Sequence, residues 1–372
     1  MILALVATSG FFYINIMPAL VESLTGGLGF DSRQAGMVSS ANVYGAALGA
    51  LVAVLLVRRL RWRPTAMVLL AVLILADLAS MQLERPMPLV GLRLLHGTAG
   101  GMLVGLTYGL IARIAAPEKT FGILLAVQFG LGGLGVALLP RLVPTFGTQA
   151  LFLTLVTLSA VSLLLMQRLP AFGVLATAPR VPAGCVAKRP LLLALLALLL
   201  FQGANMGLYA FIIDLGRHFG NGPDFISAVL LVSAWIGIAG ALLAAGMSTR
   251  FGRTWPVLAA ALVTALLTWL LLASAWPWAY ALSNIGIGVT WALVVPYLFG
   301  MAAELDRSGQ AAALAGLASK LGLATGPLAA GFLLGDGSYA WLVHLSAAAL
   351  VLSALAAMVP ARWLDRRGEP QA

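Results

Sequence analysis

Residues 45–76 read GAALGALVAVLLVRRLRWRPTAMVLLAVLILA, and this stretch decides the fold class. An apolar run ends at Val57, arginines follow at four of the next six positions, and a second apolar run begins at Thr65. A helix of about 20 apolar residues crosses the ~30 Å hydrocarbon core of a bilayer. Two such runs around a basic loop predict two membrane-spanning helices joined on the side where arginine collects.

The whole chain repeats this pattern. Of its 372 residues, 61% are hydrophobic and 9% are charged, and the mean hydropathy is +1.01. This composition is typical of a helical membrane protein and excludes a soluble domain. The net charge is +10, but the basic residues are scattered between apolar runs, so no nucleic acid partner is expected. A single cysteine, Cys185, excludes an internal disulfide and a Cys-based metal cluster.

The expected fold is an all-α membrane protein with twelve transmembrane helices. The N-terminus lacks a basic start and a small-residue cleavage site, so the first span is expected there instead of a cleaved signal peptide. The twelve predicted spans are 1–24, 34–57, 65–83, 88–114, 120–142, 149–167, 190–213, 224–248, 255–274, 277–302, 310–334 and 339–361.

Basic residues are distributed unequally between the two sides. With the N-terminus inside, the cytoplasmic loops and tail hold sixteen basic residues: Arg58, Arg59, Arg61, Arg63, Arg113, Lys119, Arg168, Arg180, Lys188, Arg189, Arg250, Arg253, Arg307, Arg362, Arg366 and Arg367. The opposite side holds four: Arg33, Arg85, Arg141 and Arg217. The positive-inside rule then predicts a multi-pass protein of the cytoplasmic (inner) membrane with both termini in the cytoplasm.

The two halves of the chain resemble each other. A shift of 187 residues superposes Gly101 on Gly288 and Pro140 on Pro327, and a shift of 192 superposes Arg61 on Arg253. We expect an N-terminal six-helix bundle over 1–167, a cytoplasmic linker over 168–189, a C-terminal bundle over 190–361 and a cytoplasmic tail over 362–372. Two parallel six-helix repeats are a known transporter architecture.

Several motifs identify the chain as similar to the major facilitator superfamily over nearly its whole length. Residues 17–20 (MPAL) and 45–50 (GAALGA) resemble the first two spans of that family. Residues 93–97 (RLLHG) resemble its fourth-span motif, and 250–253 (RFGR) resemble the second copy of its loop motif, although Thr249 replaces the motif's aspartate. The resemblance implies two six-helix bundles, alternating access, and a central cavity lined by the first, fourth, seventh and tenth spans.

Polar and aromatic stripes lie on those four spans. In the fourth span Arg93 and His96 share one helical face with Thr107, because residues recur at 100° per position. The alternative is that these side chains form hydrogen bonds that only hold the helices together. The candidate substrate-binding residues are Phe12, Asn15, His96, Gln202, Asn205, Tyr209, Asn284, Trp291 and Lys320.

Lys320 lies near the middle of the eleventh span, where an unpaired cation is costly. It is expected to face a cavity and bind an anion or act in gating; burial in neutral form or a pair across the halves is the alternative. Asp77 and Arg93 lie at similar depth on neighbouring spans, joined by the short loop 84–87. They form either a static ion pair or a proton-linked pair that couples an ion to transport.

Serine-hydrolase, H-E-x-x-H and Walker motifs are absent from the sequence, so we expect no enzyme activity, catalytic residue, cofactor or metal. We expect a secondary transporter that is proton-coupled and moves a small organic solute, with a preference for organic anions. Efflux of hydrophobic or amphipathic compounds, and a non-transporting membrane sensor on the same fold, are the alternatives. The expected partners are the solute, H⁺ and the lipid bilayer, with the monomer as the working unit.

Overall fold

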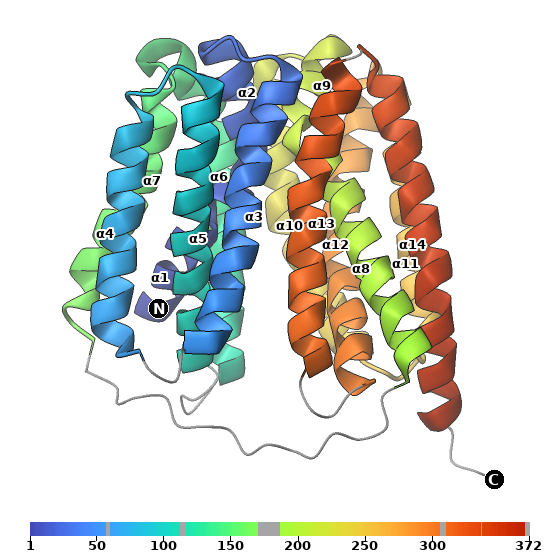
Figure 1. Cartoon of the computed structure of the whole chain (residues 1–372). Helices are drawn as coiled ribbons and strands as arrows, with labels where there is room; N and C mark the ends of the chain where they lie inside the picture. The colour runs from blue at the N-terminus through green and yellow to red at the C-terminus, as the bar shows by residue number, and fades with distance from the viewer. Residues whose placement is uncertain (57–59, 112–116, 170–186, 306–309, 336, 369–372) are drawn as a thin grey trace. The chain divides into compact units, whose positions relative to one another are not determined.

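Apolar runs form long helices throughout the described part of the chain (Figure 1). The structure is a computed structural model, and it describes residues 1–56, 60–111, 117–169, 187–305, 310–335 and 337–368. Among these residues, eleven helices are long and apolar enough to cross a membrane, or twelve when the bent pair α1 and α2 is counted as one span. The chain is thus an all-helical, multi-pass membrane protein.

The chain divides into two units, Met1–Ala178 and Pro179–Ala372. The boundary falls in the segment expected as a linker, most of which (170–186) lies outside the described residues. The first unit contains α1 (Ile2–Asn15), α2 (Met17–Gly27), α3 (Ser32–Leu56), α4 (Trp62–Ser80), α5 (Pro86–Ile111), α6 (Pro117–Phe146) and α7 (Gln149–Met166). The second unit contains α8 (Lys188–Ala210), α9 (Ile212–His218), α10 (Pro223–Met247), α11 (Thr254–Leu270), the 3₁₀ turn Leu271–Ala273, α12 (Pro277–Glu304), α13 (Gln310–Gly335) and α14 (Tyr339–Gly368).

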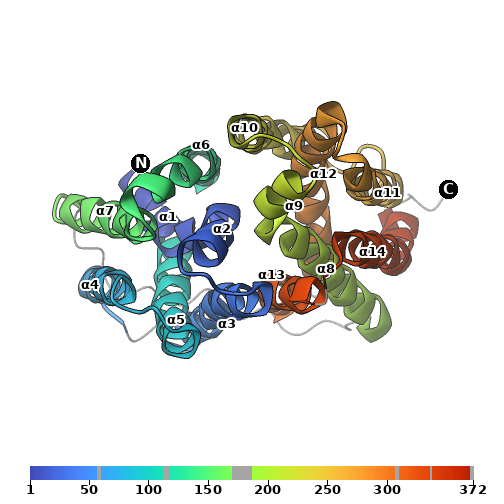
Figure 2. The ribbon, with the colours of Figure 1, turned by 90° about the horizontal axis from the view of Figure 1, so that it is seen from above.

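Both units pack their helices in the same pattern. In the first unit α1 lies against α5, α6 and α7, and α3 runs along α5 (Figure 2). In the second unit α8 lies against α12, α13 and α14, and α10 runs along α12. The contacts α4–α7 and α11–α14 complete the correspondence. The sequence repeat therefore reflects a structural repeat.

Each unit interrupts its first span at an equivalent place. The helix breaks at Ile16 (φ −102°, ψ 17°) in the first unit and at Phe211 (φ −109°, ψ 16°) in the second. The sequence analysis expected continuous spans over 1–24 and 190–213, whereas α1 and α2 meet at an angle of 49°. Pro18 at the start of α2 cannot donate a helical hydrogen bond, which favours the first break.

Helices α3 and α5 approach each other until their backbones touch. A side-chain carbon added at Gly97 would overlap the backbone oxygen of Asn42, and one added at Gly45 would overlap that of Leu94. Small residues permit such approach in lipid, where packing and interhelical hydrogen bonds hold helices together. The contact fixes α3 against the part of α5 that carries Arg93 and His96.

The outward faces of the helices are apolar. Val54, Leu75, Leu164 and Leu242 each expose between 61% and 67% of their surface. A soluble protein rarely exposes so many large apolar side chains together, whereas a bilayer solvates them.

Candidate functional site

A charged cluster lies buried between α4 and α5. Asp77 and Arg93 are fully buried, and Arg93 Nη1 donates to Asp77 Oδ1 over 2.8 Å. Arg93 Nη2 donates to the backbone oxygen of Ala76 at 3.0 Å and also to the hydroxyl of Ser80. The two charges that the sequence places at similar depth thus form a direct ion pair, with further hydrogen bonds from the same turn of α4.

His96 belongs to the same cluster. It lies one helical turn after Arg93 on α5, and its Nε2 is 3.3 Å from Asp77 Oδ2. Its Nδ1 lies 2.7 Å from the side-chain nitrogen of Asn42 on α3. The sequence analysis grouped His96 with the substrate-binding residues, whereas the structure groups it with Asp77 and Arg93.

Aromatic rings close the cluster on the side of α1 and α7. The Arg93 guanidinium carbon is 5.7 Å from the ring centroid of Tyr13 and 5.2 Å from that of Phe152. The negative face of an aromatic ring attracts a desolvated cation. These rings therefore stabilise Arg93 in a part of the protein where water does not.

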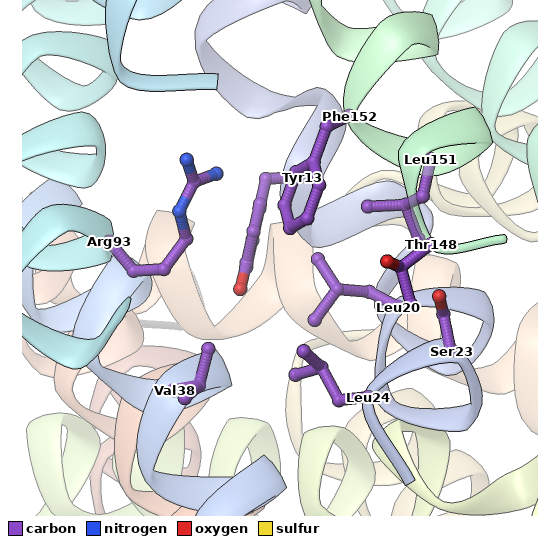
Figure 3. A pocket seen from close by; sticks show the side chains of 9 residues that line it. All are labelled: Tyr13, Leu20, Ser23, Leu24, Val38, Arg93, Thr148, Leu151 and Phe152. Atoms are coloured by element: carbon purple, nitrogen blue, oxygen red, sulfur yellow. The ribbon is translucent and has the colours of Figure 1, made fainter. Parts of the chain in front are cut away.

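A narrow space adjoins Arg93 and Tyr13 (Figure 3). It has no room for a water molecule, so the cluster is closed to solvent on this side in the observed conformation. Its lining comes from α1, α2, α3 and α5, and from the start of α7 with Thr148 before it: Tyr13, Leu20, Ser23, Leu24, Val38, Arg93, Thr148, Leu151 and Phe152.

The second unit holds a neutral polar network. Trp291 Nε1 on α12 donates to Gln202 Oε1 on α8 over 2.8 Å, and Gln202 Nε2 donates to Ser319 Oγ on α13 over 2.8 Å. The network joins three helices and fixes the indole of Trp291. Lys320 follows Ser319 directly and is half-buried.

Two asparagines near this network turn their amide nitrogens back onto their own helices. Asn205 Nδ2 donates to Phe201 O at 2.7 Å, and Asn284 Nδ2 donates to Tyr280 O at 2.8 Å. Within the described residues, the buried Oδ1 of Asn205 accepts no hydrogen bond. This oxygen is available to a hydroxyl or amide donor. Tyr209, one turn further along α8, is half-buried.

The remaining candidates lie on α1. Phe12 is buried, and Asn15 Nδ2 donates to the backbone oxygen of Gln128 on α6 at 3.3 Å. The structure thus brings together two groups within separate units: Asp77, Arg93 and His96 in the first, and Gln202 with Trp291 in the second.

Several site residues were missed by sequence reasoning. Asn42 and Ser319 contact predicted residues from another helix, and no sequence spacing indicates such contacts. Ser80 follows Asp77 by three positions on one helical face, so spacing could have indicated it. Glu22 on α2 is 95% buried, so Asp77 is not alone as a buried acid.

An acid from α14 contacts the end of the loop motif in which Thr249 replaces the aspartate. Asp365 Oδ1 accepts from the backbone N–H of Arg253 at 2.8 Å, and its Oδ2 accepts from the N–H and hydroxyl of Thr254 at 3.0 and 2.7 Å. Arg253 Nη2 donates to Glu304 at the end of α12 over 2.6 Å. The start of α11 is thereby held to α12 and α14.

Comparisons with known proteins agree with this architecture. The sequence model of a family described as "Uncharacterised MFS-type transporter YbfB" matches residues 4–358. No curated protein sequence matches significantly. Among solved structures, a D-xylose–proton symporter is similar with a TM-score of 0.76 at 15% identity, over 95% of both chains. The nucleoside transporter NupG is similar with a TM-score of 0.75 at 15% identity, over 96% of this chain and 98% of NupG. The xylose transporter XylE from E. coli, in a partially occluded inward-open conformation, reaches 0.71 at 16% identity, over 95% of this chain and 96% of XylE.

Proposed function

The chain belongs to the major facilitator superfamily of membrane transporters, and on that premise we propose that it couples proton movement to the transport of a small organic solute. The family assignment rests on the match over residues 4–358 and identifies a transporter instead of an enzyme. The similar solved structures support secondary transport as the general mechanism.

The observation that carries proton coupling is the buried Asp77–Arg93–His96 cluster. A buried ion pair is seldom needed for stability, because apolar residues of similar size often replace it without loss. An acid that can take up a proton, beside a cation that cannot lose one, instead provides two charge states at a fixed place. Protonation of Asp77 would release Arg93 from its counter-ion and alter the contact between α4 and α5.

The preference for an organic anion rests on Lys320. Arg93 is neutralised by Asp77, so Lys320 is the basic side chain that favours an anionic solute among the candidate residues. A carboxylate on the solute would form a charge-assisted hydrogen bond with its ammonium group. Gln202, Asn205, Tyr209, Asn284 and Trp291 would supply the neutral part of the same solute site.

A neutral polar solute is the second candidate. The Gln202–Trp291–Ser319 network and the unpaired Asn205 carbonyl offer hydrogen bonds and an aromatic face without charge. The similar solved structures include transporters of D-xylose and of nucleosides, which are neutral and polar.

The proposed placement is the cytoplasmic membrane with both termini inside, on the basis of the sixteen-to-four distribution of basic residues. The proposed working unit is a monomer that transports by alternating access. It consists of the bundles 1–167 and 190–361, the linker 168–189 and the tail 362–372.

Reconstitution tests the proposal. Purified protein in proteoliposomes would be offered lactate, succinate, benzoate, D-xylose and uridine, with and without an imposed pH gradient. We expect at least one of these solutes to accumulate when the gradient is present and only to equilibrate when it is absent. A solute that equilibrates through the protein but never responds to the gradient would overturn proton coupling. Protein-free liposomes provide the control.

A further inference from the structure

We propose that Asn42 is a positioning residue that fixes the proton of His96 on Nε2 and so converts proton uptake by Asp77 into a conformational change. The role of Asn42 toward His96 depends only on geometry. Its role in proton uptake rests on the proposed proton coupling.

The amide of Asn42 has a defined orientation. Its Nδ2 lies 3.3 Å from the backbone oxygen of Arg93 and 2.7 Å from His96 Nδ1. A backbone carbonyl oxygen can only accept a hydrogen bond, so the NH₂ group of the amide must face it. The reversed amide would place two oxygen acceptors against each other. Asn42 therefore donates to both partners.

This orientation decides the tautomer of His96. Because Nδ1 faces an NH₂ donor, it must be the unprotonated nitrogen that accepts. The neutral ring then carries its proton on Nε2, which lies 3.3 Å from Asp77 Oδ2. A doubly protonated ring would set its Nδ1–H against the NH₂ group of Asn42, so this contact disfavours the charged form of His96.

Asn42 cannot easily withdraw from His96. The backbone oxygen of Asn42 touches α5 at Gly97, the residue after His96, where a side-chain carbon would overlap it. A second backbone contact follows between Gly45 and Leu94. These contacts hold the backbone of Asn42 beside His96 as long as α3 and α5 stay packed.

The charged and titratable groups around His96 come from three helices. Asp77 faces it from α4, Arg93 lies on its own helix, and the Tyr13 ring from α1 is 5.9 Å away between centroids. Arg93 Nη1 occupies Asp77 Oδ1, whereas Oδ2 has only the longer contact to His96 within the described residues. An incoming proton would therefore bond to Oδ2 and neutralise the carboxylate. No covalent bond of the protein would break.

The tautomer of His96 determines how the cluster responds to that proton. A new Oδ2–H that pointed at His96 would face its Nε2–H, and one that pointed away would leave Oδ2 a weaker acceptor than the carboxylate. A free imidazole would relieve this by moving its own proton to Nδ1 and accepting on Nε2. Asn42 opposes that tautomer change, so protonation of Asp77 weakens its contact with His96. Protonation is thereby transmitted to the packing of α3, α4 and α5.

The first test is nitrogen NMR of protein labelled with ¹⁵N-histidine. The chain has 3 histidines, and the His96→Gln variant assigns the signals of His96. At neutral pH we expect wild-type His96 to show an unprotonated Nδ1 and a protonated Nε2. Asn42→Asp, which offers an acceptor to Nδ1, should protonate that nitrogen. Ser40→Ala on the same helix is the control and should leave the spectrum unchanged.

A protonated Nδ1 in the wild type, or an unprotonated Nδ1 in Asn42→Asp, would overturn the role of Asn42. The second test is transport by Asn42→Leu of a solute from the reconstitution panel. We expect exchange across the membrane to continue, while accumulation driven by a pH gradient is lost. Accumulation at the wild-type level by Asn42→Leu would overturn the conformational role. If the wild type itself ignores the gradient, the proposed function fails while the NMR result stands.

Discussion

At the scale of single residues, Arg93 and Lys320 differ in their surroundings. Arg93 has a carboxylate, a hydroxyl and a backbone oxygen as partners. Lys320 is half-buried in the second unit. It is the residue after Ser319, which accepts a hydrogen bond from Gln202. Arg93 is therefore held within the cluster, whereas for Lys320 we propose a contact with the solute.

This difference leads to a prediction for Lys320. If its ammonium binds a carboxylate of the solute, Lys320→Ala removes a charge-assisted hydrogen bond of about 1.5–3 kcal/mol. The apparent affinity should then fall about 10- to 150-fold, and Lys320→Arg should recover part of it. The measurement is counterflow of a transported carboxylate by monodisperse protein. Exposed Lys188→Ala is the matched control, and unchanged affinity in Lys320→Ala would rule out the anion contact.

Only some residues of the site could be predicted from the sequence. Asp77 and Arg93 were predicted to lie side by side, because a short loop joins their helices and a charge in lipid needs a partner. Asn42 was not predicted, because its role depends on how closely α3 approaches α5. The distance between α3 and α5 is set by glycines on both helices. The positions of glycines in a sequence do not show which helix they will pack against.

At the scale of helices, the backbone contact between α3 and α5 holds the cluster together. Gly97→Ala would push a methyl group into the backbone of α3, and overpacking of this kind costs about 1–3 kcal/mol. We expect a lower midpoint of thermal unfolding in detergent. Gly91→Ala on the same helix is the matched control, because a side-chain carbon there meets nothing within 4 Å. Its midpoint should stay the same or rise, since alanine favours helix by about 1 kcal/mol over glycine.

Equal midpoints for Gly97→Ala and the wild type would show that α3 and α5 can separate without loss. That outcome would also remove the reason why Asn42 stays against His96.

The breaks in the first span of each unit were not predicted from the sequence. Pro18 lies just after the break at Ile16. The break was not predicted because the apolar run around it is long enough for one continuous span. The break at Phe211 has no proline at all, and the structure instead shows Tyr280 on α12 donating to the carbonyl of Ile212 at 3.1 Å. A partner from another helix stabilises that break, so local sequence could not reveal it.

At the scale of the whole molecule, hydropathy and basic residues predicted the span number and fold class correctly. In a bilayer the backbone N–H and C=O groups of a long apolar run must form hydrogen bonds within the protein, and a helix is one of the few structures that provides them. The sequence repeat also predicted that the two units share one packing pattern. The contacts of the loop motif could not be predicted from the sequence. The acid that binds Arg253 and Thr254 is Asp365, which lies more than 100 positions further along the chain.

Orientation in the membrane can be tested by cysteine labelling. The native Cys185 lies outside the described residues and is expected in the cytoplasmic linker, so it should react only after cells are permeabilised. A cysteine at exposed Phe146, between the predicted fifth and sixth spans, should react from outside in intact cells. Gly147 beside it is unsuitable, because its φ of +68° favours glycine. The reverse labelling pattern would overturn the topology.

We propose that Asp77 and Arg93 form a coupling pair as well as a structural one. Asp77→Asn alone leaves Arg93 buried without its counter-ion, which costs about 3–5 kcal/mol and should lower the folded yield. The variant Asp77→Asn with Arg93→Gln removes both charges and should restore that yield.

The most direct measurement is therefore accumulation of a transported solute by this double variant in proteoliposomes under an imposed pH gradient, with exchange of the same solute measured in parallel. We predict that exchange continues and that accumulation is lost, because no acid remains at this position to carry the proton. Accumulation by the double variant at the wild-type level would contradict the account and leave the pair with a structural role alone.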